Sequence, residues 1–321
     1  MIFIGDSSDS IHVDKIKETI QKLQGRLNIK YKWYPQELNF TQCFNQMLRE
    51  VATPYASLVG DDDFLVPRNL EKCIKFLDSN KEYIGAHGVG ARIYVEKQGM
   101  NLKVNKIADY RLSPREEETA SKRLLNHMGN ISNMLFSVYR ADILKGMFEN
   151  IEIPDHSFAG DLLPGCLAVA RGKIKKLDCF HMVHLVHEGQ NQAYRDIYDW
   201  LTGPNWFPSY QMFKSILSDE LSKQDAITSD ESHSVVKKAF WSYLKYKLNN
   251  HYKFVYGSTE LKQKLKKKIP VLKKILDKAR EVKFNAFPSN EVNMHTLLNS
   301  RSPYHKDFMP VYHAVIKDLS I

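Results

Sequence analysis

The chain has 321 residues, 43% of them hydrophobic and 26% charged, and a formal net charge of +9. These proportions are typical of a soluble globular protein. No run of about 18 apolar residues occurs, and the first residues lack the basic and apolar stretches of an export signal, so we expect neither a membrane span nor a leader. The positive charge suits an anionic partner but does not choose among nucleotide, nucleic acid and lipid surface.

Four cysteines are scattered along the chain without paired spacing: Cys43, Cys73, Cys166 and Cys179. This pattern indicates reduced thiols rather than disulfides or a zinc site. We therefore expect a cytoplasmic protein.

The first quarter of the chain alternates between strand and helix patterns. Short apolar runs at 1–5, 28–34 and 55–59 predict strands, and apolar residues at helical spacing predict helices at 13–23 and 39–51. A further helix begins at Pro67. This order predicts an α/β fold with a mostly parallel open sheet and helices on both faces.

The later segments are less regular. We expect one bent strand or two at 83–95, a long polar loop at 97–118 that is either an acceptor-side lid or disordered, a strand at 134–138, helices at 140–150 and 158–171, and a strand at 173–179. Beyond residue 195 the pattern is mainly helical and rich in aromatic residues. We predict an α/β domain at 1–194 and a helical C-terminal region at 195–321.

Three consecutive carboxylates, Asp61, Asp62 and Asp63, follow the predicted strand 55–59. Ligands of open α/β sheets bind outside the carboxyl ends of strands, where these residues would lie. Like charges so close are tolerated in water, near helix N-termini or around a cation, and hard divalent cations prefer such oxygen ligands. The triplet predicts a metal site; the alternative is a solvated acidic turn that caps the next helix.

Three segments together resemble the GT-A-fold nucleotide-sugar glycosyltransferases of family 2: GDSSD at 5–9, FNQML at 44–48 and YASLVGDDD at 55–63. The resemblance covers roughly the first 190 residues and implies a GT-A, Rossmann-like fold. It implies that Asp6, Ser8 and Asp62 help to hold the nucleotide sugar, and that Asp61, Asp62 and Asp63 stand for the D-x-D motif that holds Mg²⁺ or Mn²⁺ on the sugar diphosphate. From the sequence we expect no counterpart of the family's first strand, which in that family precedes the strand that ends in the Asp6 position.

The segment Phe158-Ala-Gly-Asp161 resembles the part of that family that carries the general base of an inverting transfer. A sugar hydroxyl becomes a good nucleophile only as its proton leaves, and a nearby carboxylate can take that proton. Asp161 is therefore the predicted catalytic residue, with Asp155 as the next to test. The alternative for Asp161 is a helix N-terminal charge stabilised by the helix dipole.

His181, His184 and His187 have a spacing that invites a zinc interpretation. On a helix they would spread apart and on a strand they would alternate between faces, so we do not expect zinc. Some members of the resembled family use a late histidine at the metal or diphosphate. The resemblance therefore makes His184 or His187 a candidate, and we assign His187 to the metal; a structural histidine is the alternative.

The segment 261–283 carries ten Lys and Arg residues against two acidic residues, with apolar residues at helical spacing. Such a segment could contact an anionic membrane surface, or it could be a solvated face over an ordinary core stripe.

Taken together, these features predict a metal-dependent, inverting hexosyltransferase that uses a UDP-sugar and a glycan or lipid-linked acceptor. We expect it in the cytoplasm, where it could also lie peripherally at the inner face of the cell membrane. The alternative is a non-catalytic polyanion- or nucleic-acid-binding protein that acts through 261–283. Because no nucleic-acid-binding signature accompanies the charge, we expect no nucleic acid partner.

Overall fold

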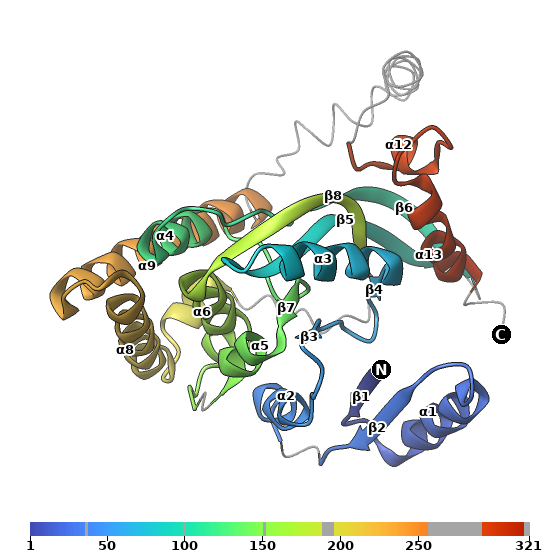
Figure 1. Cartoon of the computed structure of the whole chain (residues 1–321), viewed down its shortest axis with the longest axis horizontal. Helices are drawn as coiled ribbons and strands as arrows, with labels where there is room; N and C mark the ends of the chain where they lie inside the picture. The colour runs from blue at the N-terminus through green and yellow to red at the C-terminus, as the bar shows by residue number, and fades with distance from the viewer. Residues whose placement is uncertain (36–37, 99–100, 150–151, 188–195, 256–290, 318–321) are drawn as a thin grey trace.

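The computed structural model describes residues 1–35, 38–98, 101–149, 152–187, 196–255 and 291–317. It confirms the α/β class, with a curled sheet flanked by helices and a helical C-terminal region (Figure 1). The strands form two sheets: a two-stranded sheet near the N-terminus and a six-stranded sheet in the rest of the α/β part.

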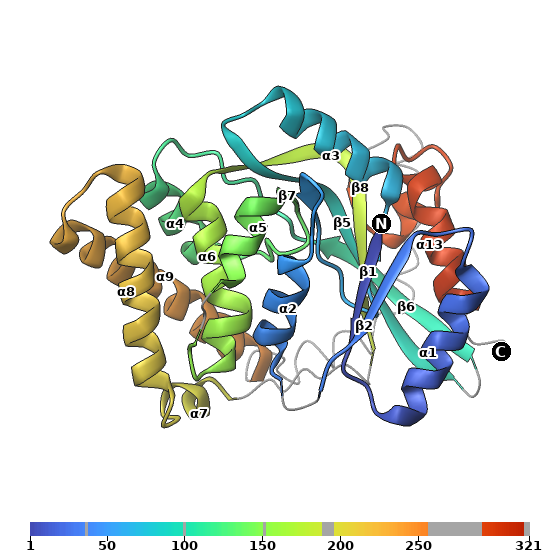
Figure 2. The same ribbon diagram turned by 60° about the horizontal axis from the view of Figure 1, so that its bottom comes forward.

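The small sheet consists of β1 (Ile2–Asp6) and β2 (Ile29–Trp33), which pair in parallel and are connected by α1 (Ser10–Leu23). Asp6 ends β1 opposite Trp33. Helix α2 (Phe40–Arg49) follows, and its start is fixed by a capping box in which Asn39 and Gln42 each satisfy the backbone N–H of the other. In Figure 1 this unit lies along the lower side of the molecule, below β3 and β4, and in Figure 2 it is turned toward the viewer.

The larger sheet has the order β3-β7-β5-β8-β4, with β6 paired to β5 beside this path. Its strands are β3 (Tyr55–Ala56), β4 (Phe64–Leu65), β5 (Tyr83–Gln98), β6 (Asn101–Tyr110), β7 (Val138–Arg140) and β8 (Lys173–Val186). Within it β5 and β8 pair in parallel, whereas the pairs β3–β7, β4–β8, β5–β6 and β5–β7 are antiparallel. The sheet is therefore mixed, not mostly parallel as the strand–helix alternation suggested.

Two long strands form the centre of this sheet. Strands β5 and β8 approach so closely at Gly88 that a Cβ there would overlap the backbone of Cys179. The residues 181–187, expected after a strand, largely belong to β8 itself. This extension carries β8 from the middle of the core to the acidic triplet.

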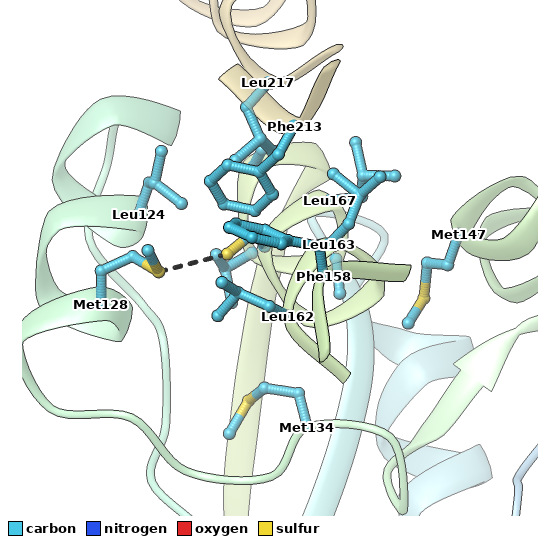
Figure 3. Packing of buried hydrophobic residues seen from close by; sticks show 14 of the residues in the cluster. Leu124, Met128, Met134, Met147, Phe158, Leu162, Leu163, Leu167, Phe213 and Leu217 are labelled. Carbon is cyan, nitrogen blue, oxygen red and sulfur yellow. Dashed lines mark hydrogen bonds between the residues drawn. The ribbon is translucent and has the colours of Figure 1, made fainter. Parts of the chain in front are cut away.

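One face of the sheet is covered by α3 (Pro67–Ser79), and the main core lies among α4 (Ala120–Gly129), α5 (Ala141–Phe148), the π-helix η1 (Ser157–Leu162) and α6 (Leu163–Arg171). Helices α7 (Ile197–Leu201), α8 (Trp206–Asp225) and α9 (Ser229–Val255) add to the same core. Phe158 stands at its centre, close to Leu162 and Phe213 (Figure 3). The 194/195 boundary remains a prediction, although buried side chains from both sides share this core.

The remaining C-terminal helices, α12 (Met294–Leu298) and α13 (His305–Lys317), return to the far edge of the sheet beside β6 and β8 (Figure 1). The buried Asn69 amide of α3 donates to the Phe180 carbonyl and to Asp307 of α13, at 2.6 and 2.8 Å. Arg68 forms an ion pair with the same Asp307. These contacts attach α13 to α3 and β8. No helix in the described ranges is long and apolar enough to cross a membrane.

Two segments differ from the sequence-based expectation. Residues 97–118 were expected as a lid or disordered loop, but residues 101–110 form β6, whose Ile107 is buried against β5. The 55–59 run was expected as a buried strand, but β3 covers two residues, and Val59 is 44% exposed. β3 is the edge strand of the larger sheet, and the run leaves the sheet after Ala56, which explains the exposure of Val59.

The two sheets are separated at their facing edges. Strand β3 ends the larger sheet, and β1 pairs with β2 within the small one. Between them lies a cavity of about 140 Å³ lined by Met1, by Phe3 of β1, by Phe44, Met47, Leu48 and Val51, and by residues of segment 53–58. The sheet is therefore interrupted between β1 and β3, with apolar side chains of α2 lining the cavity.

Candidate functional site

The acidic triplet lies in the turn between β3 and β4, and β8 holds this turn in place. The Asp63 amide donates to the Gly60 carbonyl at 3.3 Å, which closes the turn. The Asp63 carboxylate then accepts from His184 Nδ1 at 2.9 Å and from the Leu185 amide at 3.1 Å. Only 3% of the Asp63 side chain is exposed. Asp63 thus anchors the loop to β8.

The neighbouring carboxylates face outward. His187 Nε2 lies 3.3 Å from Asp62 Oδ2, and both side chains are 31% exposed. Asp61 is exposed. A Cβ at Gly60 would stand 3.0 Å from Asp62 Oδ1, so the glycine leaves room for this carboxylate. The structure brings Asp62 and Asp63 together with His187 and His184, as a cluster of oxygen and imidazole ligands open to solvent on one side.

A layer of rings and cations supports His184. The His184 ring centre lies 4.9 Å from that of Tyr110, and the guanidinium carbon of Arg92 lies 5.0 Å from the centre of the same Tyr110 ring. Arg92 on β5 is also the register partner of His184 on β8. Tyr110 and Arg92 were not expected from the sequence. Tyr110 and Arg92 reach the triplet because β5 pairs with β8 and β6, and the local sequence gives no sign of this pairing.

The three histidines fall into two environments: strand alternation separates His181 from His184, whereas His187 follows the last residue of β8 and reaches the triplet from there. His181 is fully buried, and its Nε2 lies 2.8 Å from the Phe136 carbonyl. Burial lowers the pKa of His181, which favours a neutral ring. His184 and His187 instead meet the triplet. The spacing of the three therefore does not mark one zinc site.

Asp6, the last residue of β1, has contacts of its own that do not involve the triplet. Its carboxylate accepts from the Ser8 amide at 2.8 Å and from the Tyr31 hydroxyl at 2.7 Å, and Asp6 is 6% exposed. Burial acts to raise the pKa of Asp6, but the hydrogen bonds from Ser8 and Tyr31 outweigh it, so that the pKa lies below its ordinary value. Burial and the Asp6 carboxylate raise the pKa of Tyr31 to about 12. Asp6 is therefore an ionised acceptor at neutral pH.

Trp33 extends this site along β2. Its indole nitrogen donates to the Ser8 carbonyl at 3.1 Å, and the side chain is 46% exposed. The ring thus lies at the surface beside the turn that follows Asp6. A half-exposed aromatic ring beside an ionised acceptor is a combination suited to a planar base with N–H groups.

The backbone of Asp161 belongs to η1, directly before α6. Its side chain lies outside what the structure describes. The helix expected at 158–171 is present as η1 followed by α6, with Pro164 in the first turn of α6 as the sequence required. Phe158 anchors η1 in the core through ring contacts with Trp200 and Phe213 at 5.4 and 5.3 Å.

Asp155, the second candidate in this segment, has a structural task. It is 7% exposed, and its Oδ1 accepts from the Ser157 amide at 2.9 Å and from the Trp200 indole at 3.3 Å. The Asp155 amide donates to Ser209 at 3.0 Å. These bonds tie the start of η1 to α7 and α8. A carboxylate bound in this way is poorly suited to take a proton from an acceptor.

No group of three or more His, Cys, Asp and Glu side chains is arranged to hold a metal by itself within the described residues. The donor set of Asp61, Asp62, Asp63 and His187 still fits a hard cation, because Mg²⁺ in such sites takes one or two carboxylates and completes its shell with water and substrate phosphates. The basic segment 261–283 lies outside the described residues, and so do its predicted contacts.

No protein-family model and no curated protein matches the chain. Among solved structures, S. aureus TarS 1-349 in complex with UDP-GlcNAc is similar with 16% identity and a TM-score of 0.49, over 81% of this chain and 68% of that chain. S. aureus TarS 1-349 in complex with UDP has 15% identity and a TM-score of 0.43, over 80% and 63%. A longer S. aureus TarS structure has 16% identity and a TM-score of 0.45, over 79% of this chain and 38% of that one. At this level the likeness is one of chain path and not of site residues.

Proposed function

We propose that this protein is a glycosyltransferase that moves a hexose from a nucleotide-diphosphate sugar, a UDP-sugar, to a hydroxyl group of a glycan or lipid-linked acceptor, with a divalent metal and with inversion. The observation that carries the proposal is the triplet turn fixed against β8, where Asp62 and Asp63 lie beside His187 and His184. An acidic turn that merely capped α3 would need no such attachment to a distant strand.

In this proposal Asp6 and its neighbours bind the nucleotide end of the donor. An ionised, fixed carboxylate can accept from the N–H group of a uracil, and the Tyr31 and Ser8 bonds hold it in one orientation. The Ser8 segment and the exposed Trp33 ring border the same place. Their contribution is orientation of the base.

The triplet would bind the diphosphate end of the donor through a cation. Asp61, Asp62 and Asp63, with His187, would hold Mg²⁺ or Mn²⁺ there, and the cation, when bound, supplies positive charge that stabilises the leaving diphosphate. Asp63 keeps the loop in place through His184 and Leu185. Arg92, stacked on Tyr110, adds a protein cation on the same side of the sheet as His184.

The acceptor hydroxyl would lose its proton to Asp161. A carboxylate in hydrogen-bond reach takes the proton as the oxygen attacks the anomeric carbon from the face opposite the leaving group, which inverts that carbon. The core anchoring of η1 through Phe158 supports this assignment, because a base must be held in a fixed position.

Calorimetric titration tests the donor site. We expect Mn²⁺-dependent binding of UDP-sugars by the wild-type chain, and a loss of affinity of at least about tenfold in the double variant Asp61→Asn, Asp62→Asn. Asp63 is left intact because it anchors the loop.

The matched control is Glu71→Gln, an exposed acid on α3 next to the site. It removes one negative charge without touching the triplet, so its donor affinity should equal that of the wild type. Equal affinities in the double variant and in this control would rule out the triplet as the donor site.

A further inference from the structure

Helix α9 presents an outward face that combines aromatic and apolar side chains. Trp241, Leu248 and Tyr252 are 64%, 44% and 64% exposed. At 3.6 residues per turn these three positions fall within about 40° of one another around the helix axis. They form a single stripe along the outer side of α9, called here the α9 stripe.

Another side of α9, about 60° to 160° from the centre of the α9 stripe, is buried. Val236, Ala239, Phe240, Tyr243 and Leu244 all belong to the main core, and the helix packs on α4 and α8. These side chains fix α9 on the core. Large exposed rings aligned on one side of a well-packed helix indicate a second contact.

Lysines accompany the α9 stripe. Lys237, Lys238 and Lys245 are exposed and lie within about 60° of its centre. From Ser232 to Val255 the chain has five lysines and no Asp or Glu. This part of α9 therefore contributes apolar side chains and lysines to the face; an acidic side chain beside it is Asp196, which meets His251 at 3.1 Å.

We propose that the α9 stripe is a membrane-contact surface that rests on an anionic lipid bilayer. Trp and Tyr side chains favour the boundary between acyl chains and headgroups, and lysines can extend their stems along that boundary while their ammonium groups meet anionic headgroups. From Lys237 to Tyr252 the helix rises about 22 Å, so these side chains could meet a surface that lies parallel to the helix axis. The α9 stripe includes no residue of the segment 261–283 and none of the proposed donor site.

A second copy of this chain fits the α9 stripe less well. A two-fold pairing through α9 would bring the same lysines of both copies together, with no acidic residue of that helix stretch to neutralise them. Anionic headgroups supply the missing negative charge. The charge on the face therefore favours lipid.

Vesicle co-sedimentation of the full chain tests the surface. We expect binding to phosphatidylcholine vesicles that contain phosphatidylglycerol, weaker binding at high salt, and little binding to phosphatidylcholine alone. The variant Trp241→Ser, Leu248→Ser, Tyr252→Ser should bind at least about tenfold more weakly. Replacing Lys237, Lys238 and Lys245 by Gln should lower binding about fivefold per residue.

The matched control replaces three exposed apolar residues on other elements, Ile11→Ser, Leu27→Ser and Ile316→Ser, which are 75%, 47% and 42% exposed. This control should bind vesicles like the wild type. If the α9 variant binds as well as this control, the proposal is overturned.

Fluorescence separates this contact from any made by 261–283. Lipids brominated in the acyl chain should quench Trp241, and Trp241→Phe should remove most of that quenching while vesicle binding persists. Quenching that survives Trp241→Phe overturns the proposal. So does a dimer in sedimentation velocity that Trp241→Ser converts to monomer while vesicle binding stays unchanged.

Discussion

The Asp6 carboxylate is the residue whose chemistry the fold controls most directly. Its pKa is lowered because the hydrogen bonds from Ser8 and Tyr31 outweigh the effect of burial. A group with a lowered folded-state pKa stabilises the fold above the pKa of the unfolded chain, about 3.9 for Asp, and loses that contribution as the pH falls through the folded-state value. Part of the stability of the β1–β2 unit should therefore disappear in acid.

Tyr31→Phe tests this contact. Removing a hydrogen bond to a charged group should cost about 1.5 kcal/mol of unfolding free energy at pH 7. The difference from the wild type should shrink below about pH 4, as Asp6 becomes protonated. Urea denaturation at several pH values measures both, with Tyr198→Phe, a 70% exposed tyrosine, as the control. A difference that does not change with pH would mean that Asp6 is not ionised in this contact.

Asp161 offers a second test at the scale of one side chain. If it is the base, Asp161→Asn should keep donor and metal affinity nearly constant and lower the transfer rate by roughly two to four orders of magnitude. If it is only a charge near a helix start, the change should cost under about 1 kcal/mol of stability and leave turnover intact. Transfer rate and donor affinity are measured on the same preparation. Near wild-type turnover removes Asp161 from the mechanism.

At the scale of elements, α4 depends on a cap from another helix. The Ala120 and Ser121 amides at its N-terminus donate to the two oxygens of Asp225, at the end of α8, both at 2.8 Å. Burial acts to raise the pKa of Asp225, but these bonds lower it below the ordinary value. The contact therefore stabilises the fold at neutral pH and weakens in acid.

Asp225→Ala should lower the unfolding free energy by about 1 to 2 kcal/mol at pH 7, the usual cost of losing a helix cap. Asp219→Ala, an exposed acid on the same helix, is the control and should change stability by less than about 0.5 kcal/mol. Thermal and urea unfolding provide the comparison. Equal stabilities of the two variants would show that the Asp225 cap contributes nothing.

Elements with strong local signals were predicted closely. Helix α3 begins at Pro67, and α2 starts at its Asn39 cap, because proline at a first turn and a capping box act within a few residues. Strand β6 was missed because its segment is rich in polar residues, as loops are, and because it is defined as a strand by its pairing with β5. The mixed sheet was missed for the same reason: strand direction is set by pairing across the chain, not by local pattern.

The site follows the same division. The triplet and Asp6 are recognisable because each carries its signal within a few residues at a strand end. His184 and His187 were only candidates, and Arg92 and Tyr110 were absent from the expectation, because the register of β5 with β8 brings them there. Residues that act through partners far along the chain leave no local trace.

At the scale of the whole molecule, Asp307 helps to attach the C-terminal helix α13 to α3 and the larger sheet. Asp307→Ala would leave the buried Asn69 amide without one of its acceptors and remove the ion pair with Arg68. We expect a loss of about 1 to 3 kcal/mol in unfolding free energy and faster proteolytic cleavage near α12 and α13. Lys306→Ala, an exposed neighbour, is the control. Unchanged cleavage in Asp307→Ala would mean that other contacts suffice to hold α13.

The interruption between β1 and β3 has a thermodynamic consequence. Asp6 ends a strand of the small sheet and the triplet lies in a turn of the larger one, and among the residues that the structure describes no backbone hydrogen-bond ladder joins the two sheets. A donor that touches both would act as a cross-link between two bodies that otherwise meet through side chains of α2. Donor binding would then stabilise the small sheet, and the backbone amides of β1 and β2 would exchange with solvent more slowly. The donor itself would make the two sheets behave as one cooperative unit.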